Sequence, residues 1–308
     1  MKRSQLIALV ALTFALPLAA EAQGRTQIDT TVSLEGQGTV DLSLISGEIR
    51  VTGWDRPDVR VFAVAEGDAR LRFDATRDRV NLTIDSESGR HRHHGGEARY
   101  EVSVPRGTNL VLEAVSGNIT ATDTEGEIEA TSVSGQVEVS GGKRKVSVES
   151  VSGWVRASRV SGDLRAESVS GNVRADSVAG NVDASSVSGT ISLVRVHSRA
   201  VRTETVSGNI TYVGNIEAGG NYDFESHSGT LSLSIPRGSG ARVSVETFSG
   251  DVDTNFAAVM QPGEKMRERG RFEFTIGDGR ARISAATFSG PIIINNRDAA
   301  PTTRRDDE

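Results

Sequence analysis

Residues 167–193 read ESVSGNVRADSVAGNVDASSVSGTISL, in which one phrase of about nine residues recurs three times. The glycine of the strongest copies returns every 18 residues, at Gly117, Gly135, Gly153, Gly171 and Gly189. It then returns at longer steps of 19, 21 and 21 residues, at Gly208, Gly229 and Gly250, and Gly290 follows 40 residues later. Weaker copies lie halfway, at Gly126, Gly162 and Gly180. A fixed period of this kind predicts a repeat architecture in which each unit stacks on the next.

The side chains of each unit alternate between apolar and polar. Apolar residues stand two and four positions after the glycine, as Val173 and Ala175 do, with polar residues between them. This period of two indicates β-strands, and the Ser-Gly steps are expected to bend the chain between strands. Valine also stands two positions before most of these glycines, as at Val169, and we expect it to fill the interior.

In the longer units the position two before the glycine holds a larger side chain, at Phe248 and Phe288. A wider unit leaves more interior volume, so these rings are expected to fill it. His227 occupies the same position and is expected to mark a wet or edge site.

Valine, serine, threonine and glycine oppose a helix, and an antiparallel meander would not give successive strands identical sequences and bends. A chain that coils on itself would give successive strands the same sequences and bends, because each turn of the coil then meets an equivalent turn about 4.8 Å away. The predicted fold is an all-β, single-chain parallel β-solenoid (β-helix), with 18–21-residue coils of two strands each, capped at both ends.

The ends of the chain differ from the repeats. Lys2 and Arg3 precede an apolar run from Leu6 to Ala20, which is typical of a secretory signal peptide with cleavage after Ala22. The stretch AAVMQPGEKMRERG (257–270) is the only helix-like one. We expect a signal peptide (1–22), irregular N-terminal β cap and first coils (23–110), regular solenoid (111–250), C-terminal coils and cap (251–295) and a disordered tail (296–308).

Composition narrows the possible partners. The formal net charge is −6, which disfavours nucleic acid, because nucleic-acid binding needs a basic surface. The chain has no cysteine, so neither disulfides nor a lipidated cysteine is expected. No integral membrane segment is expected after signal cleavage, and an exported protein of the periplasm or cell surface is predicted.

Two segments share a strand, then Pro-Arg-Gly, then a strand that ends in Ser-Gly: VSVPRGTNLVLEAVSGNI (102–119) and LSLSIPRGSGARVSVETFSGDV (231–252). With LISGEIRVTGWDRPDVRV (44–61), they make residues 40–295 resemble the bacterial putative-adhesin family of unknown function. That resemblance implies an exported β-solenoid domain of the cell envelope and supplies no catalytic or cofactor-binding residues. The regular block of 18-residue units (117–189) is a departure from the family's pattern.

Four positions before the strong glycines the sequence places a carboxylate, interrupted by Thr131 and Ser185. In a stack these residues would form an exposed acidic row that could bind divalent cations or a basic partner, although a solvated face that keeps the protein soluble is the favoured interpretation. Arg156 and Arg174 lie on neighbouring strands and are expected to supply counter-charge. The row consists of Glu113, Glu149, Glu167, Glu204, Glu225 and Glu246.

Two other groups of polar residues are weaker candidates for a binding site. Asn118, Asn172 and Asn209 follow the glycine and are expected to satisfy backbone groups at the bends. The segment GRHRHHGGEARY (89–100) holds His91, His93 and His94, which could bind zinc or copper but lack the spacing of a metal site. We predict no metal, no cofactor and no catalytic residues.

The function predicted from sequence is an exported, non-catalytic solenoid that presents extended polar faces for envelope structure, adhesion or partner binding. An envelope protein or a surface glycan is the expected partner. Two alternatives stay open: a carbohydrate-active β-helix enzyme of the polysaccharide lyase or hydrolase type, and a periplasmic sensor that signals to a partner. Converging carboxylates in a cleft would favour the enzyme, whereas flat faces would favour the scaffold.

Overall fold

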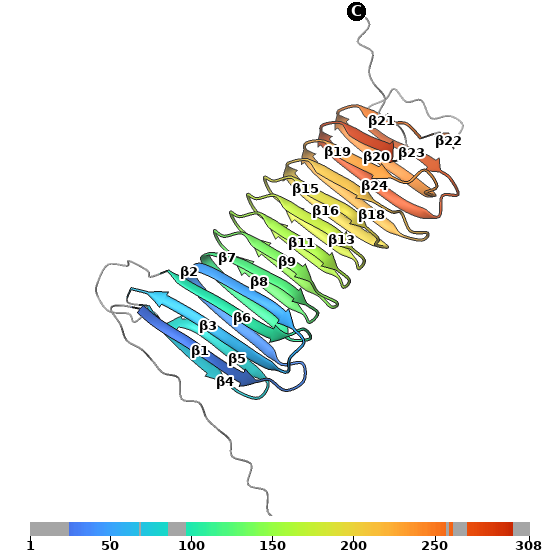
Figure 1. Cartoon of the computed structure of the whole chain (residues 1–308). Helices are drawn as coiled ribbons and strands as arrows, with labels where there is room; N and C mark the ends of the chain where they lie inside the picture. Colours follow the sequence, from blue (N-terminus) through green and yellow to red (C-terminus); the bar gives the residue numbers. More distant parts are fainter. Residues whose placement is uncertain (1–24, 68, 86–96, 257–258, 261–269, 298–308) are drawn as a thin grey trace, which may run out of the picture.

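The computed structural model describes residues 25–67, 69–85, 97–256, 259–260 and 270–297, and in these residues the regular secondary structure is entirely β-strand, joined by turns and loops. The chain winds into a long stack, with the N-terminal strands at one end and the C-terminal strands at the other (Figure 1). The predicted all-β, mostly parallel, solenoid-like fold is therefore confirmed.

Each turn of the chain, here called a rung, places one strand in each of two parallel ladders. In the first ladder, Val146 pairs with Ile128 of the rung before and with Leu164 of the rung after. Its regular members are β8 (Ile128–Ser132), β10 (Val146–Ser150), β12 (Leu164–Ser168), β14 (Val182–Ser186), β16 (Ala200–Ser207) and β18 (Asn221–Ser228). Those of the second ladder are β9 (Val137–Gly141), β11 (Val155–Val160), β13 (Val173–Val178), β15 (Ile191–Val196), β17 (Ile210–Gly214) and β19 (Leu231–Ile235).

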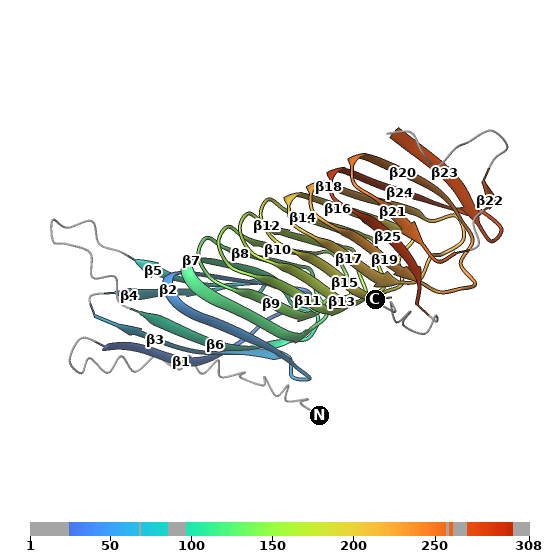
Figure 2. The same ribbon diagram turned by 90° about the horizontal axis from the view of Figure 1, so that it is seen from above.

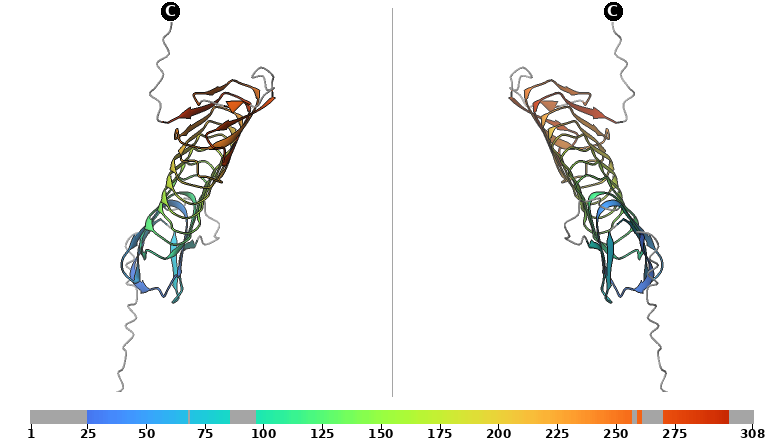
Figure 3. Two further views of the ribbon diagram at one scale, coloured as in Figure 1. Left: turned by 90° about the vertical axis from the view of Figure 1, so that its right-hand side faces the viewer. Right: turned by 90° about the vertical axis from the view of Figure 1, so that its left-hand side faces the viewer.

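Two long strands, β2 (Thr39–Trp54) and β7 (Asn109–Thr124), belong to both ladders. In β7, Leu110 pairs with Ile128 of the first ladder and Ile119 pairs with Val137 of the second. All strands are thereby joined in one hydrogen-bonded sheet that folds back on itself, with a narrow interior between its two sides (Figure 3).

The interior holds the apolar residues that follow each glycine, and Val173 and Ala175 are fully buried. Three buried aromatic residues fill the rungs with longer units: Tyr212, Tyr222 and Phe224. The ring of Tyr212 packs against each of the other two. The expectation that Phe248 and Phe288 fill this space is wrong, because both rings are exposed.

The valine two positions before the strong glycine also points outward, contrary to the prediction. Val169 is 44% exposed, whereas Val178, at the same place before the weak glycine, is buried. We call the bends at the strong and weak glycines the strong and weak corners. Just before the weak corner, Ser177 has a φ of 58°, a left-handed conformation. This one residue shifts the alternation of inward and outward side chains by one position. At the strong corner the alternation continues without a shift, so Ser168 turns inward and Val169 outward.

At the N-terminal end the rungs are out of sequence order. β5 (Arg79–Asp85) and β6 (Ala98–Pro105) pair in parallel with β2, on the side away from the regular rungs. The outermost strands are antiparallel: β3 (Asp58–Glu66) on β6, β1 (Arg25–Ser33) on β3, and β4 (Arg70–Ala75) on β5 (Figure 2).

At the C-terminal end the last strands lie inside the stack. β24 (Ala281–Ser289) pairs with both β18 and β20 (Ala241–Ser249), and β25 (Ile292–Asn296) pairs with both β19 and β21 (Val252–Thr254). Gly290 therefore sits between Gly229 and Gly250 rather than beyond them. β22 (Val259–Met260) and β23 (Gly270–Ile276) add antiparallel strands to this end. Val259 and Met260 are extended in a segment expected to be helix-like, most of which lies outside the described residues.

The two Pro-Arg-Gly sequences mark corresponding places in the two irregular ends. Residues 105–107 carry the chain from β6 past the β2 rung to β7. Residues 236–238 carry it from β19 past the β24–β25 rung to β20. Each motif thus lies where the chain crosses over one rung that another part of the chain occupies.

Candidate binding face

The predicted acidic row lies on the first ladder, and the strand register aligns its members. Glu149 pairs directly with Glu167, and Glu204 with Glu225. Thr131 stands between Glu113 and Glu149, Ser185 between Glu167 and Glu204, and Ala286 between Glu225 and Glu246.

The counter-charges of this row are not the predicted ones. Arg165 approaches Glu167 at 2.5 Å, and Arg202 approaches Glu204 at 3.5 Å, each from two residues earlier on the same strand. Arg156 and Arg174 lie on β11 and β13 of the second ladder, because the Ser-Gly corner separates them from the glutamates.

Arg156 and Arg174 pair with each other in register. Arg156 lies 3.7 Å from Glu138 and stacks over the ring of Trp154 with its guanidinium carbon 5.1 Å from the ring centre. They contribute to the opposite face, and the acidic row keeps four glutamates without an ion pair among the described residues: Glu113, Glu149, Glu225 and Glu246.

Beside the acidic row runs a line of exposed residues, one per rung and apolar in every rung except that of His227, which we call the apolar ridge. Each member stands two positions before the strong corner and two positions after the acidic row. The sequence contains this signal, but the alternation alone does not reveal that these residues face solvent. In spatial order the ridge is Ile45, Val115, Val133, Val151, Val169, Val187, Val206, His227, Phe288 and Phe248.

The C-terminal end of the ridge is an aromatic stack. The rings of His227 and Phe288 lie 5.0 Å apart and nearly parallel, and those of Phe288 and Phe248 lie 4.8 Å apart. This spacing equals the distance between neighbouring rungs, so register alone brings the rings into contact. Phe248 ends the line and is 61% exposed. His227 is exposed, but it lies within the line, between Val206 and Phe288, and not at its edge.

A shallow groove of about 420 Å³ lies between the acidic row and the apolar ridge. One wall carries Glu149, Glu167 and Glu204, and the other carries valines from Val151 to Val206. Among the described residues that line it, none is basic. The groove therefore combines apolar surface with negative charge over several rungs.

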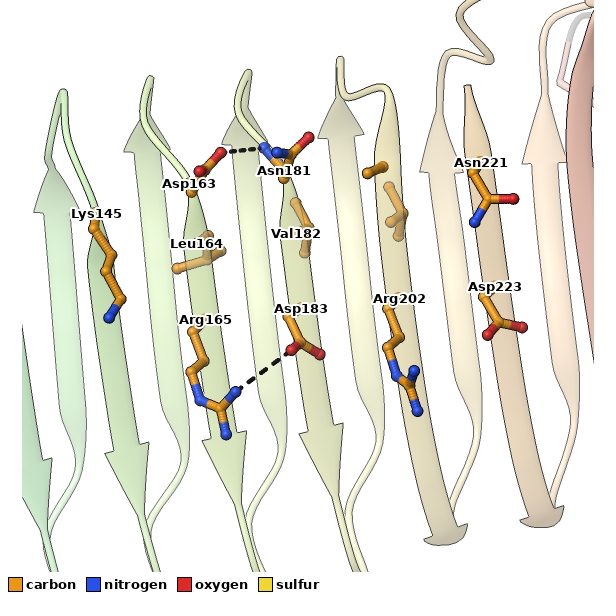
Figure 4. Close-up of a pocket in the computed structure, with 12 residues that line it drawn as sticks. Lys145, Asp163, Leu164, Arg165, Asn181, Val182, Asp183, Arg202, Asn221 and Asp223 are labelled. Carbon is orange, nitrogen blue, oxygen red and sulfur yellow. Dashed lines mark hydrogen bonds and ion pairs between the residues drawn. The ribbon is translucent and has the colours of Figure 1, made fainter. Parts of the chain in front are cut away.

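A second depression, of about 450 Å³, lies further back on the first ladder (Figure 4). Its charges alternate in sign from rung to rung: Arg165 lies 3.5 Å from Asp183, and Arg202 and Asp223 continue the series. Asp163 accepts a hydrogen bond from the backbone N–H of Asn181 at 2.9 Å. These groups balance one another rather than converging as carboxylates would in a hydrolase or lyase.

Beneath the ridge, a buried serine that is not among the candidates predicted from sequence connects successive rungs. Ser168 donates to the carbonyl of Gly153 at 3.0 Å and accepts from the N–H of Gly171 at 2.9 Å. Asparagine side chains perform the predicted role at the corner: Asn172 accepts from the N–H of Thr190 at 2.9 Å. The serine and asparagine hydrogen bonds link successive rungs and so hold the ridge and the acidic row in register.

The buried ionisable groups are structural. Tyr222 donates to the carbonyl of Ser198 at 2.6 Å, and Tyr212 donates to that of Asn215 at 2.7 Å. Burial raises the pKa of both phenols, as it does that of Tyr100, so all three remain protonated. His91, His93 and His94 lie outside the described residues, in which no cluster of three metal-binding side chains occurs.

In the part of the chain that the structure describes, no helix is long and apolar enough to cross a membrane. A comparison with curated proteins found no match.

Three solved structures cover most of the chain. Putative adhesins from Parabacteroides distasonis and Bacteroides fragilis are 10% and 14% identical, with TM-scores of 0.48 and 0.38, and each comparison covers 87% of this chain and 96% of the other. A putative cell adhesion protein from Clostridium sporogenes is 11% identical, with a TM-score of 0.27, over 88% of this chain and 99% of the other.

A protein-family model also matches this chain in sequence. The model of the Toastrack DUF4097 family matches residues 101–214 and again residues 163–295, which together span both the regular rungs and the C-terminal end. This chain belongs to the Toastrack DUF4097 family.

Proposed function

We propose that this protein is an exported, non-catalytic solenoid that binds a partner in the cell envelope along its extended faces. The observation that supports this proposal most is the register of its outward-facing residues: an exposed valine returns in every rung from Val115 to Val206, about 4.8 Å apart, beside a row that is mostly glutamate. Such a row suits a long, repetitive contact, whereas catalysis needs unlike groups that converge on one point.

The chain's organisation supports export and a single-molecule stack. Cleavage after Ala22 would release residues 23–308 into the periplasm or to the cell surface. Coils of 18–21 residues would then form the stack, and the antiparallel strands β1, β3 and β4 at one end and β23 at the other would act as caps. Caps of this kind keep an open sheet edge from pairing with another molecule.

The proposal is tested by co-sedimenting the purified mature protein with isolated envelope fractions while assaying acidic polysaccharides for cleavage. Saturable binding without cleavage is the expected result. Reproducible cleavage that disappears when Asp163, Asp183 and Asp223 are changed to asparagine would instead support the carbohydrate-active enzyme.

A further inference from the structure

The apolar ridge leaves a long, continuous strip of apolar surface in contact with solvent. Its ten rungs extend over about 43 Å at the usual spacing of strands. Stacking on neighbouring rungs covers about half of each side chain, and the other half faces outward, as the 44% exposure of Val169 shows. A strip of this length is on the order of several hundred Å², comparable to the largest apolar patch of a typical monomer, which is often functional.

The charge beside the ridge indicates what could cover it. The groove offers carboxylates on one side, valines on the other, and no basic residue among those that line it. Arg165 and Arg202 approach the row from the side away from the ridge, and Glu149 has no ion pair among the described residues. A complementary partner therefore presents an apolar stripe flanked by positive charge.

The repeat distance indicates the partner's secondary structure. Rungs recur at about 4.8 Å, close to the pitch of an α-helix, about 5.4 Å per turn. An extended strand laid along the ridge would repeat its same-side residues only about every 6.6 Å, out of step with the valines. A helix of about 13 residues would span the rungs from Val133 to Val206.

We propose that the apolar ridge and the acidic row together bind a cationic amphipathic helix, with its apolar side on the valines and its lysines or arginines on the glutamates. This inference rests on the proposed function and names the chemistry of the partner. A second copy of this chain would bring another acidic row. An anionic lipid surface would be repelled by the row and would meet a ridge only one residue wide.

The test uses the whole mature protein and a synthetic helix of about 18 residues, with leucine on one face and lysine on the others. Its affinity is measured by calorimetry for the wild type and two variants. One is V151T/V169T/V187T, which keeps side-chain size and β propensity but removes apolar surface; the other is E149Q/E167Q/E204Q. Each variant is expected to weaken binding about tenfold or more.

Matched controls make the same chemical changes on the second ladder. V194T/V213T alters two partly buried valines there, and E138Q/D251N/D253N removes three carboxylates, two on strands of this ladder and Asp251 just before β21. Both are expected to bind like the wild type. A peptide with glutamate in place of lysine should not bind, and binding to the wild type should fall steeply as salt is raised.

Equal peptide affinity for the ridge variants and the wild type would overturn the proposal. So would a wild-type dimer that V151T/V169T/V187T dissociates in sedimentation, since a second copy would then be the occupant. The same variants are also co-sedimented with envelope fractions. If the peptide does not bind but the envelope still does, only the ridge proposal fails; if the wild type does not bind the envelope either, the proposed function fails.

Discussion

The hydroxyl of Ser150 donates a hydrogen bond to the carbonyl oxygen of Gly135, 2.8 Å away on the preceding rung, and accepts one from the N–H of Gly153 at 2.9 Å. The same pair of bonds recurs at Ser132 and Ser168. A buried side chain thus extends the backbone hydrogen-bond ladder around the corner, where the strands themselves are interrupted.

Replacing Ser150 with alanine is expected to lower the free energy of unfolding by about 1–3 kcal/mol, because a buried carbonyl and a buried N–H both lose their partner. Chemical denaturation of the whole protein measures the change. Ser152 is exposed two residues later, and S152A should change stability by less than about 0.5 kcal/mol. Equal effects of the two substitutions would refute the role assigned to the buried serine.

Gly153 is required by close approach rather than by backbone conformation. A Cβ at this position would lie 1.9 Å from the carbonyl oxygen of Gly135, a backbone atom that cannot move aside without breaking the ladder. G153A is expected to destabilise the protein by more than about 3 kcal/mol or to prevent folding. At Gly238 a Cβ would meet no atom within 4 Å, so G238A is the control and should unfold at nearly the wild-type denaturant concentration.

Arg106, in the first Pro-Arg-Gly sequence, donates to Asp55 at 2.7 Å and also to the carbonyl of Asp123 at 3.2 Å. The hydrogen bond and the charge of Arg106 lower the pKa of Asp55. A lowered pKa in the folded state means that the pair stabilises the protein above the carboxyl's ordinary pKa and loses this effect as pH falls through the folded-state value.

In R106Q the pKa of Asp55, followed by NMR, should therefore rise toward the ordinary range. The difference in unfolding free energy between wild type and R106Q should shrink as the pH falls below about 4. Because the hydrogen bond from Arg106 to the backbone carbonyl of Asp123 does not depend on the protonation of a carboxylate, a small difference should persist in acid. A difference that grows on acidification would contradict the assignment.

The equivalence of the regular rungs predicts that one can be removed. Deletion of residues 154–171 joins Gly153 to Asn172 and leaves β9 to pair with β13 and β10 with β14, in the register that neighbouring rungs already use. The shortened protein should fold, and small-angle scattering should show it shorter by about 4.8 Å.

Deletion of residues 154–162 alone provides the contrast. It would place a strand made for the first ladder in the second ladder and replace a weak corner with a strong one. We expect this variant to be markedly less stable than the full-rung deletion, by urea denaturation. Equal stability would mean that the two corners are interchangeable.

The sequence was sufficient to predict the parallel stack, because the strong glycines keep one period over residues 117–189 and the same apolar positions follow each of them. It could not predict the direction of Val169, since Val178 occupies the same place in the pattern and points the other way. That difference depends on the left-handed conformation of Ser177, which serine seldom adopts. The equivalent positions of other rungs hold Asp123, Gly141, Arg159 and Arg195, which share no residue type, so the repeat does not announce the conformation.

The candidate site was predicted only in part, because the repeat fixes the register of side chains but not the direction in which each one points. The register of Glu149 and Glu167 follows directly from the 18-residue period, whereas the neighbouring ridge was assigned to the interior. The repeat pattern also could not predict where β24 and β25 lie in the stack. Gly290 follows Gly250 by about two units in sequence but precedes it in space. Only the pairing of distant strands determines that order.

The inserted position of β24 and β25 has a consequence for synthesis. A chain made from its amino terminus completes β18–β19 and β20–β21 before the strands that separate them exist. β18 and β20 both pair with β24 in the same register, since Asn221 and Arg242 each lie opposite Arg282. Pairing of β18 with β20 would occupy the strand edges that β24 needs, so the last rung can enter only if that pairing has not formed or is reversed.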